Sequence, residues 1–288
     1  MSARPWLWLG LAVVCGAARA APIEVYAAGD IADCTSRPAA RTAAAATARL
    51  IPAHALVIVA GDAVYGPPTA ETYDRCYTPT WGSHLPRTLA VAGNHDYQDG
   101  HADAFFAYFG PAAGDGGRLL RRIGTWQIIG LDSELEGQEL ERQSDWLRSV
   151  LESGRDAACT LAFWHRPVFS SGAHHGSGQM MRTAWRLLDE FQADAVINGH
   201  EHFYEAFDPQ DVDGHHTTTG LREFVVGTGG AELHGFWRPP YHSRARIERH
   251  GVLHLTLGDG SYAWEFIDVN GTVADRGQAR CRRADTVR

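Results

Sequence analysis

The sequence predicts an α/β fold with a polar site at the carboxyl ends of its strands. Short apolar runs rich in β-branched residues alternate with segments of helical spacing up to residue 198, and strand-like pairs follow from residue 203 onward. Five of the apolar runs end in Asp, Asn or His. Because ligands of open α/β sheets gather outside the carboxyl ends of strands, these endings indicate one shared site.

The expected elements follow from these patterns in chain order. Strands are expected at 22–28, 55–60, 88–92, 160–164 and 194–197, then as pairs at 203–207, 222–228, 252–258 and 261–269. Helices are expected at 38–50, 101–109, 138–153 and 178–191, with loop and short helix at 66–87 and a hairpin at 118–132. Turns at Gly258-Asp259-Gly260 and Asn270-Gly271 separate the later strands.

The composition fits one large soluble domain. The chain has 288 residues, of which 44% are hydrophobic and 21% charged, and no Pro/Ser/Gly-rich linker divides it. A formal net charge of −8 gives no electrostatic reason to expect a nucleic-acid partner. All 26 basic residues are arginines, so Schiff-base chemistry and a phosphate-binding-loop lysine are excluded.

The first twenty residues have the pattern of an export signal. Arg4 gives a positive start, residues 6–16 form an apolar core, and Ala18-Arg19-Ala20 is a small-x-small cleavage site. The apolar core is too short to span a bilayer, and no later stretch reaches about 18 apolar residues. We therefore expect a signal peptide at 1–20 with cleavage near Ala20, a single domain at 21–288, a periplasmic or secreted location and no membrane anchor.

Four cysteines remain after this segment is removed. An even number in an exported protein suggests two disulfides, for which three pairings exist. Cys34 and Cys76 lie in loops after early strands, and Cys281 could tie the tail to Cys159 at a strand start. We therefore favour Cys34–Cys76 and Cys159–Cys281.

The polar strand endings have the chemistry of a metal site. They are Asp30, Asp62, Asn94, His165, and His200 with His202. Oxygen and nitrogen donors without thiolates suit Zn(II), Mn(II) and iron. The set is too large for one tetrahedral ion, so two ions that share a carboxylate are expected. Two ions about 3.5–4 Å apart activate water and neutralise phosphate charge, so the pattern predicts hydrolysis of a phosphate ester.

In their order, these endings resemble the calcineurin-like metallophosphoesterase superfamily. The pattern Asp, Gly-Asp, Gly-Asn-His-Asp/Glu, His and Gly-His-x-His is matched between about residues 23 and 270. The resemblance implies a metallophosphoesterase catalytic domain with a four-layer αββα sandwich of two mixed β-sheets and helices outside. Most members have a histidine where this chain has Ala32. The purple acid phosphatase branch lacks that histidine and has a tyrosine three residues after the second aspartate, where Tyr65 stands.

The resemblance also implies a ligand set, carried over residue by residue. The first ion would be held by Asp30, Asp62, Tyr65 and His202. The second ion would be held by Asp62, Asn94, His165 and His200. Asp62 would bridge the two. A phenolate is a hard, anionic ligand, so the implied cofactors are Fe(III) in the first position and Zn, Mn or Fe(II) in the second.

Histidines outside the ligand set match the catalytic residues of that branch. His95 matches a phosphate-contacting histidine, and His174 and His175 match a pair that orients phosphate and donates a proton. The implied reaction is in-line attack by a metal-bound hydroxide on a small phosphomonoester, with His175 or His95 protonating the leaving alkoxide. We take His175 as the principal acid because it lies in a Gly/Ser-rich loop outside the ligand set.

Two alternatives stay open. A phosphodiesterase or nucleotidase could use the same site, since Arg166, Arg182 and the aromatic residues of 73–81 could shape either pocket. A metal-binding or redox protein could use an iron–tyrosinate pair without hydrolysis, although such a site does not need the three non-ligand histidines. His234, after a glycine-rich strand exit, is a weaker candidate for lining the pocket.

Overall fold

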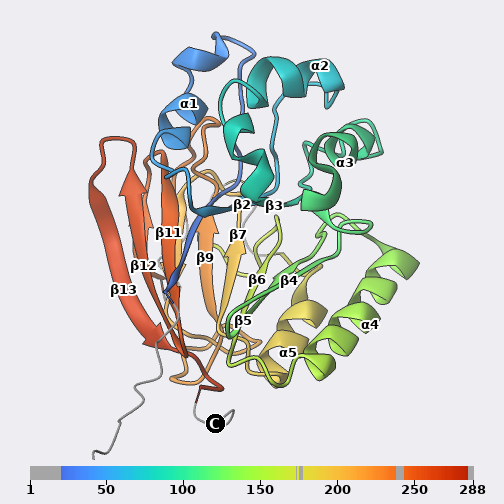
Figure 1. Cartoon of the computed structure of the whole chain (residues 1–288), viewed down its shortest axis with the longest axis vertical. Coiled ribbons are helices and arrows are strands. Elements are labelled where there is room, and N and C mark those ends of the chain that lie inside the picture. Colours follow the sequence, from blue (N-terminus) through green and yellow to red (C-terminus); the bar gives the residue numbers. More distant parts are fainter. Residues whose placement is uncertain (1–20, 173, 175–177, 238–242, 285–288) are drawn as a thin grey trace, which may run out of the picture.

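Two mixed β-sheets packed face to face carry the fold, as Figure 1 shows for a computed structural model. The structure describes residues 21–172, 174, 178–237 and 243–284, so the expected signal peptide and His175 lie outside the described residues. One sheet has the strand order β13-β12-β11-β1-β2-β3, and the other has the order β10-β8-β9-β7-β6-β5-β4. This arrangement confirms the predicted α/β fold of two mixed sheets with helices.

The first sheet combines parallel strands from the start of the chain with antiparallel strands from its end. Its strands are β1 (Ile23–Ala28), β2 (Leu56–Ala60), β3 (Thr88–Val91), β11 (Gly251–Gly258), β12 (Ser261–Asp268) and β13 (Val273–Arg280). Strands β1, β2 and β3 are parallel, and β11 pairs antiparallel with β1. The carboxyl ends of β1, β2 and β3 therefore meet at one edge of the sheet.

The second sheet has a parallel centre with antiparallel strands on both sides. Its strands are β4 (Leu119–Ile123), β5 (Trp126–Gly130), β6 (Cys159–Phe163), β7 (Ala195–Asn198), β8 (Tyr204–Phe207), β9 (Arg222–Val226) and β10 (Ser243–Ile247). Strands β5, β6, β7 and β9 run parallel to one another. Strands β4, β8 and β10 are antiparallel to their neighbours.

Aromatic side chains fill the space between the sheets. The ring of Tyr204 in β8 stacks on that of Phe266 in β12, with centroids 4.2 Å apart. Phe224 in β9 lies edge-on to Trp264 in β12, at 5.4 Å. Such ring pairs contribute about 0.5–1.5 kcal/mol each beyond the burial of their surface. These contacts fix the position of one sheet against the other.

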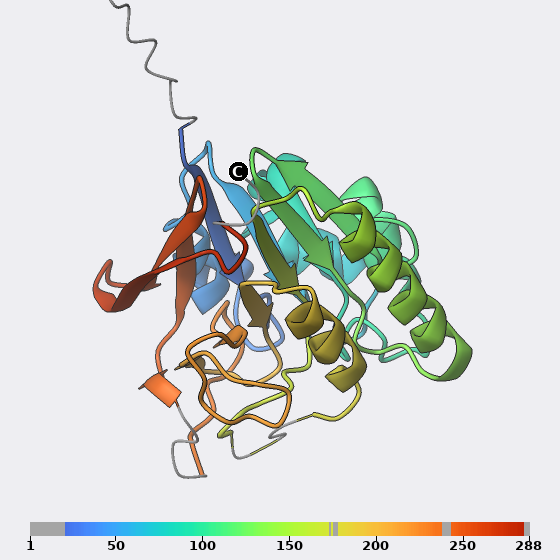
Figure 2. The ribbon, with the colours of Figure 1, turned by 90° about the horizontal axis from the view of Figure 1, so that it is seen from below.

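Helices cover the outer face of the second sheet and the loops of the first. They are η1 (Ala39–Arg41), α1 (Ala43–Ala48), α2 (Ala70–Thr72), η2 (Tyr73–Tyr77), η3 (Gly82–Arg87), α3 (Asp103–Phe109), η4 (Gly110–Ala113), α4 (Gly137–Ser153) and α5 (Arg182–Glu190). Leu147 of α4 and Trp185 of α5 are buried in one cluster with Val196 of β7. Figure 2 shows these two helices on one side and β11–β13 on the other. No helix among the described residues is long and apolar enough to cross a membrane.

Two strands that the sequence pattern did not indicate lie at sheet edges. Strand β10 has the sequence Ser-Arg-Ala-Arg-Ile, and strand β13 alternates half-buried and exposed residues without an apolar run. An edge strand tolerates polar and charged side chains because one of its sides faces solvent. Their hydrophobic signal is therefore too weak for detection by periodicity.

The structure contains both predicted disulfides. Cys34 is joined to Cys76, which ties the loop after Asp30 to η2. Cys159 at the start of β6 is joined to Cys281 after β13, so this bond links the two sheets across 122 residues of sequence.

Loss of the inter-sheet disulfide is expected to destabilise the protein strongly. For a loop of 122 residues, the chain-entropy model gives about 5 kcal/mol at 25 °C. The double variant Cys159→Ser/Cys281→Ser should therefore unfold in urea at a much lower concentration than the wild type. The matched variant Cys34→Ser/Cys76→Ser, which opens a loop of 42 residues, should lose about 4 kcal/mol. Unchanged urea midpoints in both variants would contradict this expectation.

Candidate metal centre

The carboxyl ends of five strands converge on one cluster of side chains. Asp30 follows β1, Asp62 follows β2 and Asn94 follows β3 in the first sheet. His165 follows β6, and His200 with His202 follows β7, in the second sheet. Because both sheets contribute, the cluster forms only where the strand ends of the two sheets face each other.

The backbone is strained at three of these positions. Asp30, Asp62 and His200 have φ angles of 58°, 51° and 70°, in the left-handed region. This conformation costs a residue with a side chain roughly 1–2 kcal/mol. Adjacent glycines allow the close approach, since a Cβ on Gly61 would lie 2.3 Å from Nδ1 of His165. Backbone strain of this kind is found at functional sites, where the surrounding structure supports it.

Three predicted ligands form a first donor group. The hydroxyl of Tyr65 donates to Oδ1 of Asp30 at 2.9 Å and lies 2.8 Å from Nε2 of His202. Nε2 of His202 is in turn 3.1 Å from Oδ1 of Asp30. The three donor atoms thus surround one point. The structure brings Tyr65 together with Asp30 from the first of the predicted motifs and His202 from the last.

Three further predicted ligands form a second donor group beside the first. Nε2 of His165 lies 3.2 Å from Oδ1 of Asn94 and 3.2 Å from Nδ1 of His200. The same nitrogen is 3.2 Å from Oδ2 of Asp62. Ligand atoms of Asp30, Asp62 and His165 all lie within 4.8 Å of one another, a spacing that can hold a metal ion.

Asp62 belongs to both donor groups through one oxygen. Its Oδ2 is 3.2 Å from Nε2 of His165 and 3.4 Å from the hydroxyl of Tyr65. Its other oxygen, Oδ1, accepts the backbone N–H of His95 at 2.8 Å. Oδ2 is therefore the oxygen of Asp62 that lies next to both donor groups.

Backbone carbonyls orient two of the imidazole rings. Nδ1 of His165 is 2.9 Å from the carbonyl of Ala60, and Nδ1 of His202 is 2.6 Å from the carbonyl of Glu232. A carbonyl only accepts, so each Nδ1 carries the hydrogen and each Nε2 presents a lone pair to the cluster. This second layer of hydrogen bonds is typical of metal-binding histidines.

Electrostatics in the cluster favour bound cations. Burial alone would raise the pKa of Asp30, but the charge and hydrogen bond of His202 lower it well below its usual range. Burial would lower the pKa of His165, yet Asp62 raises it to about 10. The buried carboxylates thus require positive charge at the donor atoms that surround them. Metal ions would meet the same requirement with the same donor atoms, so the residues present fit a metal centre.

The predicted catalytic histidines lie beside the first donor group. The ring of His95 packs against Tyr65 with centroids 4.3 Å apart, and its Nε2 is 4.0 Å from Oδ2 of Asp62. The ring of His174 stacks on His234 at 4.1 Å, and His234 stacks on His202 at 4.1 Å. His234 is therefore part of the site wall, a position for which its sequence context gave only a weak signal.

Two buried glutamates fix the segment that leads from His165 to His174. Glu223 of β9 accepts the N–H groups of Val168 and Phe169 at 3.0 and 3.2 Å. Glu205 of β8 accepts the N–H of Ser171 at 3.0 Å. Burial raises the pKa of Glu223 well above its usual range, and the two backbone N–H groups partly offset this shift. The segment is therefore attached to the second sheet.

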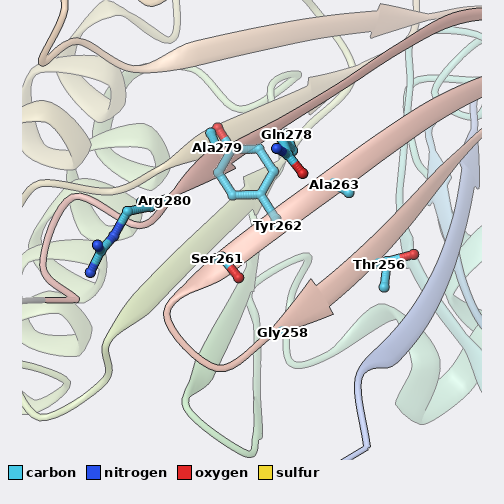
Figure 3. A pocket seen from close by; sticks show the side chains of 8 residues that line it. All are labelled: Thr256, Gly258, Ser261, Tyr262, Ala263, Gln278, Ala279 and Arg280. Atoms are coloured by element: carbon cyan, nitrogen blue, oxygen red, sulfur yellow. The ribbon is translucent and has the colours of Figure 1, made fainter.

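One cavity of about 320 Å³ opens next to the second donor group. The residues that line it are Arg166, Pro167, His174, Gly178, Gln179, Met180, Met181 and His200. A larger cavity of about 480 Å³ lies on the outward face of β11–β13, where Thr256, Ala263 and Gln278 are cross-strand neighbours. Figure 3 shows this second cavity, and its lining contains none of the predicted site residues. The smaller cavity is therefore the candidate substrate pocket.

Cys159, Asp194 and Cys281 also lie close enough together to suggest a metal site. The two cysteines are joined in a disulfide, and Asp194 accepts the backbone N–H groups of Thr160 and Arg282. This group is therefore a structural tie between the sheets.

Comparison with known proteins agrees with this geometry. A family model described as calcineurin-like phosphoesterase matches residues 23–204. An uncharacterized protein of Mycobacterium tuberculosis is 27% identical over 149 residues, which cover 42% of this chain and 28% of that protein. The matched region thus spans 28% of the length of the curated relatives.

Two solved structures share the fold over most of this chain. Purple acid phosphatase PPD1 from yellow lupin (Lupinus luteus) seeds has a TM-score of 0.77 and 17% identity, covering 91% of this chain and 54% of that chain. GAP50, described as the anchor in the inner membrane complex of Plasmodium, has a TM-score of 0.70 and 15% identity, covering 93% of this chain and 91% of that chain. At these identities the likeness shows the fold.

The variant Asp62→Asn is expected to bind metal more weakly at both donor groups and to lose at least one ion, because it removes the charge of the shared oxygen. Asparagine keeps the size of the side chain and an acceptor for the N–H of His95. Elemental analysis should find two ions per chain in the wild type and at most one in the variant. The control is Asp33→Asn, since Oδ1 of Asp33 accepts from Thr35 in a nearby turn. Two ions retained in Asp62→Asn would show that the oxygen is not shared.

Proposed function

The chain belongs to the calcineurin-like phosphoesterase family, whose model covers residues 23–204, and we propose that it is a dinuclear-metal phosphatase acting on small phosphomonoesters. The observation that carries the proposal is the placement of Oδ2 of Asp62 between two donor groups, 3.4 Å from Tyr65 and 3.2 Å from His165. A single carboxylate oxygen shared in this way suits two adjacent ions.

In this proposal each donor group holds one ion. The first group is Asp30, Tyr65 and His202, the second is Asn94, His165 and His200, and Asp62 belongs to both. Two ions bound there would supply an activated water and neutralise the charge of the phosphoryl group. The phenolate of Tyr65 supports Fe(III) in the first group, and the nitrogen-rich second group supports Zn, Mn or Fe(II).

The chain's own histidines then have the task of proton transfer. His95 packs on Tyr65, and about 30% of its side chain is exposed, so it lies next to the donor atoms without belonging to either group. His174 reaches the same wall through its stack on His234. An imidazole that protonates the leaving alkoxide typically raises the reaction rate by about 10²- to 10⁴-fold, as general acids do. We assign this role to His175, with His95 and His174 as supporting groups.

Two other functions would use the same fold. The cavity of about 320 Å³ beside His200 has room for a second ester group, which favours a phosphodiesterase or nucleotidase as the first alternative. A non-hydrolytic metal-binding or redox protein is the second alternative, since the phenol of Tyr65 beside Asp30 and His202 could serve an iron–tyrosinate pair. Such a role leaves His95, His174 and His175 without a task.

We also propose that the protein is exported before it acts. The two disulfides are of the kind that forms in oxidising compartments, and they support a periplasmic or secreted location. Cleavage near Ala20 would release the domain of residues 21–288.

Purified protein should contain two ions per chain and hydrolyse p-nitrophenyl phosphate faster than bis(p-nitrophenyl) phosphate. Metal analysis, a visible spectrum and both assays test this directly. The variant His165→Ala should lose activity together with metal. Cleavage of the diester alone would favour the first alternative, and a colourless protein that holds only zinc would contradict the iron assignment. A metal-loaded protein inert towards both esters would support the second alternative.

The variant His175→Ala is expected to lower kcat by roughly 10²- to 10⁴-fold while leaving the metal content intact, because a general acid does not hold the ions. Turnover and elemental analysis of the same preparation check both parts. His215→Ala is a suitable control, since His215 lies on an exposed turn where it contacts Asp211. Loss of metal from His175→Ala would show that His175 is a ligand.

A further inference from the structure

Arg166 follows His165 directly and lines the candidate substrate pocket. Among the described residues that line this cavity, Arg166 is the one arginine, and its other neighbours there are His174, His200 and largely uncharged side chains. Arg182, on the adjoining helix, does not line the cavity, because its guanidinium donates to the carbonyl of Val212 at 2.9 Å. The permanent positive charge of this pocket wall is therefore that of Arg166.

Glu134 holds the guanidinium in one orientation. Nε of Arg166 donates to both carboxylate oxygens of Glu134, at 2.8 and 3.0 Å, and Nη2 donates to Oε2 at 2.9 Å. Glu134 is itself fixed, since its N–H donates to Asp132 at 2.8 Å and its side chain is only 10% exposed. A side-on pair of this kind is rigid and occupies Nε and Nη2. It leaves Nη1 as the nitrogen that faces the site.

Nη1 lies one imidazole ring away from the metal ligands. It is 3.1 Å from Nε2 of His200, whereas Nδ1 on the opposite side of the same ring is 3.2 Å from Nε2 of His165. The width of the ring separates Arg166 from the donor atoms. A phosphoryl group held at those atoms is therefore not the natural partner of Nη1, but a second anionic group on the same substrate would lie in the adjoining cavity.

We propose that Arg166, oriented by Glu134, binds a second anionic group of the substrate and selects phosphate esters that carry one over esters of neutral alcohols. The proposal rests on the proposed function, since it describes what the same site accepts. The chemical class is a phosphorylated acid or a diphosphate, in which a carboxylate or second phosphate stands next to the scissile group. A guanidinium suits either anion because its positive charge is permanent, and Nη1, the nitrogen that Glu134 does not occupy, would donate the hydrogen bond.

A matched pair of substrates tests the selection. 3-Phosphoglycerate has a carboxylate where glycerol 3-phosphate has a neutral hydroxymethyl group. The wild type should have the higher kcat/KM for 3-phosphoglycerate. Arg166→Gln should reduce that preference on the order of tenfold to a hundredfold, since it removes a charged hydrogen bond. Arg166→Lys should keep part of it, and Glu134→Gln should reduce it while the arginine is still present. Arg182→Gln is the control and should leave the ratio unchanged.

A binding measurement separates this proposal from the proposed function. Calorimetry on the metal-loaded protein should show tighter binding of methylenediphosphonate than of methylphosphonate, with the difference lost in Arg166→Gln. If the wild type hydrolyses no phosphate ester, the proposed function fails, and this measurement still decides the role of Arg166. An equal loss for both ligands or both substrates, an unchanged preference, or loss of metal from Arg166→Gln would each overturn the proposal.

Discussion

The burial of two carboxylates, Asp30 and Asp62, is the constraint on which the rest of the site depends. Their exposed fractions are 0% and 1%, and an unpaired charge in such a position costs several kcal/mol. Neither sheet can satisfy this charge alone. The imidazoles of His165 and His202 approach from the second sheet to within 3.2 Å of these carboxylates. The face-to-face packing of the sheets is therefore both the architecture of the fold and the means by which the charge is balanced.

The same constraint explains how the surroundings are organised. Carbonyls of Ala60 and Glu232 hold the far nitrogens of two histidines, so the near nitrogens are turned to the carboxylates. Glu223 ties the chain after His165 to β9 through backbone N–H groups. Beyond this layer, Arg166 and Glu134 form a neutral pair at the pocket wall. The buried carboxylates are thus surrounded first by imidazoles and then by an arginine whose charge is paired with that of Glu134.

The sequence alone was sufficient where function and backbone pattern coincide. A strand that ends in Gly-Asp, or in Asn, indicates both the edge of a sheet and a donor atom, so Asp30, Asp62 and Asn94 could be proposed as ligands from their positions. Both disulfides were also predicted, and the two mixed sheets were expected from the family resemblance. Tyr65 required the resemblance as well, because a loop tyrosine has no periodic signal.

What the sequence did not reveal depends on tertiary contacts. His234 reaches the site by stacking on His202, from a segment without regular structure. Glu134 comes just after β5, which lies next to β6 in the sheet. Because β5, like the other strands, is followed by polar residues, its end could have been recognised from the sequence as a further contributor to the site. Strands β10 and β13 escaped detection because edge strands need no apolar run.

The distribution of the proposed ligands over residues 30–202 has a consequence for how the centre is assembled. Asp30 follows β1 of one sheet, and His202 follows β7 of the other, so a chain emerging during synthesis has neither donor group complete until the segment after β7 is in place. Ion capture would then be a late event in maturation. Which ions enter would depend on the supply where the chain finishes folding, and much less on the affinity of any early fragment.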